Sequence, residues 1–209
     1  MADKTVITIG REFGSGGREI GKKLAEQLQI AFYDKELLEV AAKESGICKE
    51  LFESNDEKPV NSLLYSLSVN PYSTGAIAGT SDVMPISNKL FLAQFDAIRK
   101  IANHHSCVIV GRCADYALRN EPDCFHIFIR APLQSRIARI KQLYELSSGE
   151  AKELILKTDK KRSAYYNSYA DHKWGEIGNH HLVIDSSILG ITGSVELIKK
   201  FLELQRNYK

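Results

Sequence analysis

Glycines and arginines suited to binding an anion lie close together near the start of the chain, in the segment Gly10-Arg11-Glu12-Phe13-Gly14-Ser15-Gly16-Gly17-Arg18. Glycine tolerates the positive φ angles that a backbone needs to curl around an anion, and it leaves room for phosphate oxygens near the amides. The segment also precedes a helical pattern, and a helix N-terminus carries partial positive charge. The predicted nucleotide-binding residues are Gly10, Arg11, Gly14, Ser15, Gly16, Gly17 and Arg18.

The segment departs from the common phosphate-loop pattern G-x-x-x-x-G-K-[ST], because it has neither the lysine nor the hydroxyl that follows it. If Gly16 is the second glycine of the pattern, Gly17 stands at the lysine position. In a loop one or two residues longer, Arg18 takes the lysine position and Glu19 that of the magnesium-binding hydroxyl. Arg11 and Arg18 are both candidate cations, although a guanidinium fork does not reproduce an ammonium point charge.

Two other interpretations of this segment stay open. A glycine-rich turn between a strand and a helix can occur without any ligand. A dinucleotide-binding loop, G-x-G-x-x-G, would begin at Gly14 and Gly16, but Glu19 stands at the third glycine. Asp34 has roughly the spacing of the acidic residue that binds a ribose in such folds. The missing glycine and the arginines further along the chain favour a polyphosphate over a dinucleotide.

Five short apolar runs must position this loop, and each but the last is followed by a helical pattern. The runs cover residues 5–10, 31–34, 107–111, 125–130 and 181–185. Continuously apolar strands that alternate with helices are typical of a parallel sheet covered on both faces. The predicted fold class is therefore α/β, with a five-stranded parallel sheet between two layers of helices. Ligands bind at the carboxyl ends of such strands, so Arg112, after the third run, is a candidate binding residue.

The composition of the 209 residues, with 44% hydrophobic and 26% charged, fits one globular domain. A net charge of +2 gives no reason to expect a nucleic acid or a membrane as partner. No apolar run approaches the ~20 residues of a membrane helix. The chain shows no secretory pattern, so we expect a cytoplasmic protein. Residues 58–87 hold three of the five prolines and a small, polar tract over 70–82, which predicts either a functional insertion or a surface loop.

A resemblance to a known family is carried by TIGREFGSGGREIGKKLAEQLQ at 8–29 and FYDKELL at 32–38, which are similar to the cytidylate-kinase-like family, relatives of bacterial cytidylate kinase. Later segments appear in the order of that family: CVIVGRCADYAL, FIRAPLQSRIARI, TDKKRSAYYNSY and LVIDSSILGITGSVELI. The resemblance implies a doubly wound sheet of the P-loop nucleoside monophosphate kinase type. It also implies transfer of phosphate from ATP, with Mg²⁺, to CMP, dCMP or a related small acceptor. An acceptor-binding lobe would cover about 35–87, and a lid about 135–172.

The resemblance implies phosphate-binding roles for arginines beyond the loop. Arg136 and Arg162 would grip the acceptor phosphate or the transferring phosphate, and Arg139 is a weaker candidate one turn beyond Arg136. Together with Arg18, they give the expected catalytic set Arg18, Arg136 and Arg162. Arg136 could instead be a solvated residue on its helix face.

The resemblance also implies residues that bind the acceptor. Arg112 would approach its base and Asp159 its ribose, while Asp34 and Lys35 lie where the acceptor lobe begins. Structural alternatives stay open for each position. Arg112 could cap carbonyl groups at a strand end or pair with Asp115, and Asp159 could form an intrahelical ion pair with Arg162.

Two further alternatives concern the aromatic run near 165–174 and the function itself. Tyr165, Tyr166, Tyr169 and Trp174 could stack on a base or pack the last helices together. The missing lysine is compatible with a non-catalytic module that holds a nucleotide or an anion without turnover. A dinucleotide-type oxidoreductase is a third reading. The sequence leaves the metal ligands, the acceptor and the oligomeric state open.

Overall fold

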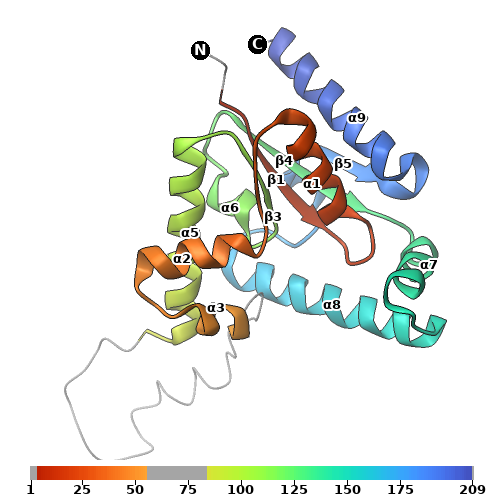
Figure 1. Ribbon diagram of the computed structural model, residues 1–209, viewed down its shortest axis with the longest axis horizontal. Coiled ribbons are helices and arrows are strands. Elements are labelled where there is room, and N and C mark those ends of the chain that lie inside the picture. The colour runs from red at the N-terminus through yellow and green to blue at the C-terminus, as the bar shows by residue number, and fades with distance from the viewer. Residues whose placement is uncertain (1–3, 56–83, 209) are drawn as a thin grey trace, which may run out of the picture.

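One parallel sheet forms the centre of the protein in the computed structural model, which describes residues 4–55 and 84–208 (Figure 1). Its strands are β1 (Val6–Arg11), β2 (Ala31–Tyr33), β3 (Cys107–Val110), β4 (Cys124–Arg130) and β5 (Leu182–Asp185). They lie in the order β2-β3-β1-β4-β5, and every neighbouring pair is parallel. The five predicted strands and the α/β fold class are confirmed, and the strand boundaries differ by no more than one residue at either end.

Helices cover both faces of this sheet, as Figure 1 shows. On one face lie α1 (Gly17–Leu28) and α9 (Ser186–Asn207). On the other lie α2 (Glu36–Ser45), α5 (Ile86–His104) and α6 (Ala114–Ala117). The two layers confirm the doubly wound arrangement. They also explain why the strands are continuously apolar rather than alternating.

Successive side chains of the central strands pack alternately against these two layers of helices. On β1, Ile7 and Ile9 are fully buried against α1 and α9, whereas Val6 belongs to the cluster beneath α2 and α5. On β3, Val108 belongs to the cluster beneath α1 and α9, and Ile109 belongs to the cluster beneath α2 and α5. Both faces of the central strands are therefore closed to water, and the carboxyl end of the sheet remains as the place for a ligand.

A pair of helices, α7 (Leu133–Tyr144) and α8 (Ser148–Tyr169), passes the carboxyl end of the sheet. Ser147 and Glu150 form a capping box that begins α8. A small apolar cluster joins the two helices, and Phe13 from the glycine segment packs against it. The pair is therefore anchored to the segment that the sequence singles out.

The aromatic run at the end of α8 packs helices together. Tyr165 and Tyr166 are buried in a cluster with Phe91 of α5, and the rings of Phe91 and Tyr169 stack with centroids 3.8 Å apart. Helix α3 (Lys49–Asn55) and the 3₁₀ turn η1 (Ile177–Asn179) complete the described elements.

The predicted insertion over 58–87 lies outside the described residues as far as residue 83, and so does its polar tract over 70–82. Within 4–55 and 84–208, no helix combines the length and the apolar character needed to cross a bilayer.

A buried histidine in the middle of β4 should make stability depend on pH. His126 is 7% exposed, and its Nδ1 lies 2.8 Å from Oγ1 of Thr8. Its ring stacks on His181, and Cys124 is also near it. Burial, with His181 and His180 close by, lowers the pKa of His126 to about 4. Burial also lowers the pKa of His181.

We expect the free energy of unfolding to fall by up to about 3 kcal/mol as the pH decreases from about 6.5 to about 4. In this window the unfolded chain binds a proton at His126 and the folded protein does not, so acid favours unfolding. His126→Asn should flatten this dependence in urea titrations, whereas His104→Asn, at an exposed position, should not. An unchanged slope in His126→Asn would show that another group is responsible.

Candidate functional site

The glycine segment forms the loop between β1 and α1, at the carboxyl end of the central strand of the sheet. Gly14 has a φ of 84° and Gly16 a φ of 81°, in the left-handed region that favours glycine. Gly16 is the N-cap of α1, and no described side chain caps that end of the helix. Glycine turns that lead into an uncapped helix N-terminus have the geometry of an anion-binding nest.

Four amides of this loop are available to a ligand. The N–H groups of Gly14, Gly16, Gly17 and Arg18 donate to no acceptor in the part of the chain that the structure describes. The first N–H groups of a helix have no partner within it, so water or a ligand must satisfy them. The anion-binding interpretation depends on this observation, because amides that were bonded internally could not bind phosphate.

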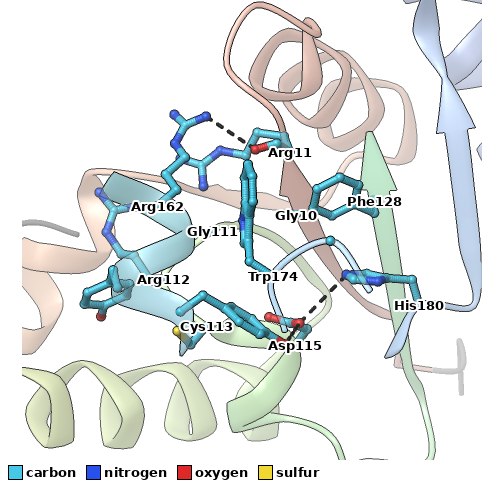
Figure 2. A pocket seen from close by; sticks show the side chains of 13 residues that line it. Gly10, Arg11, Gly111, Arg112, Cys113, Asp115, Phe128, Arg162, Trp174 and His180 are labelled. Atoms are coloured by element: carbon cyan, nitrogen blue, oxygen red, sulfur yellow. Dashed lines mark hydrogen bonds and ion pairs between the residues drawn. The ribbon is translucent and has the colours of Figure 1, made fainter. Parts of the chain in front are cut away.

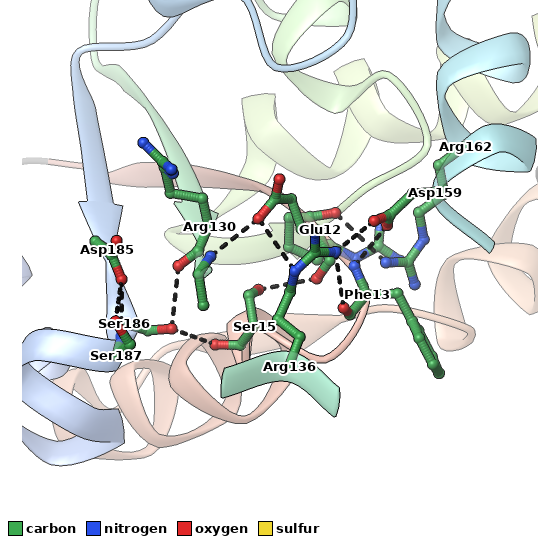
Figure 3. Close-up of polar contacts among 12 residues, drawn as sticks. Glu12, Phe13, Ser15, Arg130, Arg136, Asp159, Arg162, Asp185, Ser186 and Ser187 are labelled. Carbon is green, nitrogen blue, oxygen red and sulfur yellow. Dashed lines mark hydrogen bonds and ion pairs between the residues drawn. The ribbon is translucent and has the colours of Figure 1, made fainter. Parts of the chain in front are cut away.

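The preceding residues of the loop are bonded to the protein. The amide of Glu12 donates to the carbonyl of Ile129 at 3.0 Å. The amide of Phe13 donates to Oδ1 of Asp159 at 2.7 Å, and its carbonyl accepts from Nη1 of Arg136 at 3.3 Å. Figure 3 shows Asp159 and Arg136 around Phe13. Helices α7 and α8 thus hold both backbone groups of one loop residue.

Arg136 and Asp159 form an ion pair at the centre of this arrangement. Arg136 is 8% exposed, and its Nε also lies 3.6 Å from Oε2 of Glu12. The structure therefore rules out the solvated alternative for Arg136. The ion pair described for Asp159 reaches across to α7 rather than along α8 to Arg162. Whether Asp159 also binds a ribose stays a prediction.

Arg162 approaches the same loop from the next turn of α8. Its Nη1 donates to the carbonyl of Arg11 at 3.4 Å, and its guanidinium carbon lies 5.6 Å from the centroid of the Phe13 ring. Three predicted residues, Arg136, Asp159 and Arg162, are thus brought together on residues 11–13 of the loop.

A second group of predicted residues meets at Asp34, at the end of β2. Asp34 is 5% exposed; its Oδ2 lies 2.6 Å from Nε of Arg18, and its Oδ1 lies 3.0 Å from Nη1 of Arg112. Burial raises the pKa of Asp34, but the nearby guanidinium groups outweigh it and hold the pKa below its usual value. Arg112 also donates to the carbonyl of Val110 at 3.4 Å. Arg112 thus makes the contact with a carbonyl group that was one structural alternative for it. The described ion pair of Arg112 is with Asp34 and not with Asp115.

Two predicted residues lie apart from these groups. Lys35 is exposed at the N-cap of α2. Arg139 pairs with Glu19 of α1. Burial raises the pKa of Glu19, but Arg139 and Lys23 outweigh it and the pKa lies below its usual value. Glu19 is thus a paired carboxylate, which does not favour its use at a hydroxyl position.

A cavity lies beside the loop, and Figure 2 shows Arg11 and Arg162 at one end of it and Asp115 and His180 at the other. The ends of three strands, α8 and the segment after it contribute to its wall. Its lining residues are Gly10, Arg11, Gly111, Arg112, Cys113, Asp115, Phe128, Arg162, Tyr165, Tyr166, Trp174, Gly175 and His180. The cavity, of about 20 Å³, combines three arginines with aromatic rings, the side-chain types that contact a phosphate and a planar base.

Sequence reasoning missed part of this lining. The ring of His180 lies 5.1 Å from that of Phe128, and its Nε2 lies 3.9 Å from Oδ2 of Asp115. Tyr166 donates to the same carboxylate at 2.7 Å. A Cβ on Gly10 would lie 2.7 Å from the ring of Phe128, which favours glycine there, but the sequence does not show which side chain fills that space. His180 lies outside every regular pattern, so no comparable signal pointed to it.

A second cavity, of about 170 Å³, lies on another side of the loop. Oγ of Ser186, at the start of α9, donates to the carbonyl of Ser15 at 2.6 Å and ties this junction to the loop. The lining residues are Gly14, Ser15, Ala131, Ser135, Arg139, Ser186, Ser187, Gly190 and Ile191. The loop thus has a cavity on two sides.

We expect Asp159→Ala to lower the free energy of unfolding by about 2–4 kcal/mol, because it leaves a buried guanidinium and the Phe13 amide without their carboxylate. Glu153→Ala, which removes an exposed carboxylate from the same helix, should change it by less than about 0.5 kcal/mol. Urea denaturation of both variants measures the difference. Equal, small changes would show that the Asp159 contacts do not stabilise the fold.

The family model for the cytidylate kinase-like family matches residues 6–188, which include the loop, the sheet and helices α7 and α8. No curated protein sequence matches the chain. A crystal structure of an uncharacterized protein from Eubacterium ventriosum is similar, with 28% sequence identity and a TM-score of 0.70 over 96% of this chain and 99% of that one. Shikimate kinase from Bacteroides thetaiotaomicron shares the fold, with 15% identity and a TM-score of 0.54 over 96% of this chain and 99% of the other. The protein therefore has a P-loop kinase fold and belongs to the cytidylate kinase-like family.

Proposed function

We propose that the protein transfers a phosphoryl group from ATP to a nucleoside monophosphate, with CMP and dCMP as the first acceptors to test. The observation that carries this proposal is the set of open amides of Gly14 and of Gly16 to Arg18 at the head of α1. They lie where polyphosphates bind in folds of this kind, and one cavity adjoins the loop at Gly10 and Arg11 and another at Gly14 and Ser15. Family membership and the kinase fold support the same conclusion.

In the proposed complex, the open amides bind the phosphates of ATP, and the rest of the donor extends into the cavity beside Ser186 and Ile191. The acceptor binds at the cavity lined by Arg112 and Arg162, which has to widen from about 20 Å³ to admit the base among the aromatic rings. Phosphoryl transfer needs mainly alignment of the two substrates and neutralisation of charge, so fixed arginines and amides are the relevant groups.

Magnesium fits the loop residues poorly. Oγ of Ser15 donates to the carbonyl of Glu12 at 2.9 Å, and Glu19 pairs with Arg139. Neither oxygen is therefore directed at a metal position next to the open amides. Mg²⁺ commonly reaches kinase sites bound to nucleotide phosphates and water, so the proposed reaction does not depend on a protein ligand to the metal.

Screening for ADP release across nucleoside monophosphates and small phosphate acceptors, with ATP and Mg²⁺, tests the proposal. We expect turnover with at least one pyrimidine monophosphate. Arg162→Ala should lower kcat about 10³-fold or more, because it removes a cation from the acceptor cavity. Lys160→Ala, two residues earlier and exposed, is the matched control and should keep activity. If the folded protein releases no ADP with any acceptor, the proposed enzymatic function is rejected.

A non-catalytic nucleotide-binding module is the second candidate, favoured by the absence of a lysine and a hydroxyl at the usual loop positions. Thermal-shift titrations with ATP and CMP, with and without Mg²⁺, separate the two functions. Stabilisation by ATP that is independent of Mg²⁺, without ADP release, would indicate the module.

A further inference from the structure

Gly17 stands at the lysine position of the common loop pattern, and the structure explains why it is a glycine. A Cβ on Gly17 would lie 2.6 Å from Cβ and 3.2 Å from Cγ of Arg11. Real Cβ atoms do not come this close to another carbon, and a Cβ cannot move aside without its backbone. The side chain of Arg11 therefore fills the space that a side chain at position 17 would need.

The same alignment places Arg11 at the first glycine of the pattern. With Gly16 as the second glycine, G-x-x-x-x-G-K runs from residue 11 to residue 17, so that arginine replaces glycine at its start and glycine replaces lysine at its end. The cation of the pattern is thus missing at position 17 and an arginine is present at position 11. Because these two positions adjoin each other, the loop keeps one cation, at position 11 instead of position 17.

Arg11 is also well placed to meet an anion. It lines the cavity together with Arg112 and Arg162, at the end shown in Figure 2. Burial raises the pKa of Asp34, and the charge of Arg11 helps to lower it, with a smaller effect than those of Arg112 and Arg18. The guanidinium of Arg11 thus acts on the region between the loop and the acceptor cavity.

Arg18, the other candidate cation, is directed elsewhere. Its Nε is held by Oδ2 of Asp34 at 2.6 Å, and its guanidinium lies 6.0 Å from the ring centroid of Phe32. Its side chain is 59% exposed. Arg18 therefore links α1 to the end of β2.

We propose that Arg11, at the end of β1, binds the donor polyphosphate in place of the missing loop lysine. Residue 17 is a glycine because the side chain of Arg11 occupies the space that a side chain there would need. The inference rests on the proposed function, since it names the cation of the same site. The ligand class is a nucleoside triphosphate or another linear polyphosphate.

Transfer of the cation back to position 17 tests this directly. Arg11→Gly removes both the charge and the obstructing Cβ, whereas Arg11→Ala removes the charge and keeps the Cβ. The double variant Arg11→Gly/Gly17→Lys therefore has room for a lysine, apart from Cβ of Ile129 at 3.3 Å, which must yield by a few tenths of an ångström. Lys22→Ala, an exposed cation of α1, is the control. Titration calorimetry with ATP and with inorganic tripolyphosphate measures affinity, and circular dichroism confirms folding.

We expect Arg11→Ala and Arg11→Gly to weaken the binding of both probes about tenfold or more, because a charge-assisted contact is lost. The double variant should bind several-fold more tightly than Arg11→Gly, while Arg11→Ala/Gly17→Lys should not recover, since its Cβ still obstructs position 17. Lys22→Ala should bind as the unmodified protein does.

The outcomes separate this inference from the proposed function. If the unmodified protein binds ATP and both single variants bind it equally well, the role of Arg11 is wrong and the proposed function stands. If Arg11→Gly weakens binding and the folded double variant Arg11→Gly/Gly17→Lys does not restore it, the idea that Arg11 replaces a lysine at position 17 is wrong. If the unmodified protein binds neither probe, the proposed function fails and the inference fails with it.

Discussion

The rest of the site depends on the hydrogen bonds that join helices α7 and α8 to one loop residue, Phe13. Its amide and its carbonyl are both bonded to side chains of these helices, Asp159 and Arg136, which are themselves paired. The stretch before the glycine turns is thereby fixed, and the amides of Gly14 and of Gly16 to Arg18 are left open. The same contacts join the two helices to the sheet through the glycine loop, so the position of α8 and the shape of the loop are set together.

The architecture could be predicted from the sequence because it follows from local patterns. The five apolar runs become the five strands, since continuous burial on both faces leaves a direct trace in composition. The glycine segment was equally visible, because the positive φ angles at Gly14 and Gly16 restrict the residue type. The likeness of several ordered segments to one family was confirmed over residues 6–188.

The partners of the site residues could not be predicted in the same way. Arg112 meets Asp34, which is 78 positions away, and Asp159 meets the Phe13 amide, which is 146 positions away. Such pairs depend on how distant elements pack, and periodicity carries no information about this. The contact between Gly17 and Arg11 is likewise invisible in one dimension, because a glycine gives no sign of which side chain fills the space beside it.

The pairing of Asp34 with two arginines bears on how the site behaves before any ligand arrives. Each guanidinium already has a counter-ion that orients it, so part of the entropy of ordering it is lost on folding rather than at binding. At Arg112, which lines the cavity, an incoming anion would have to compete with the carboxylate of Asp34 for the guanidinium. If the site binds phosphates as proposed, ligands with a single, weakly charged group would be at a disadvantage against doubly charged phosphates, and the site would select for charge as well as for shape.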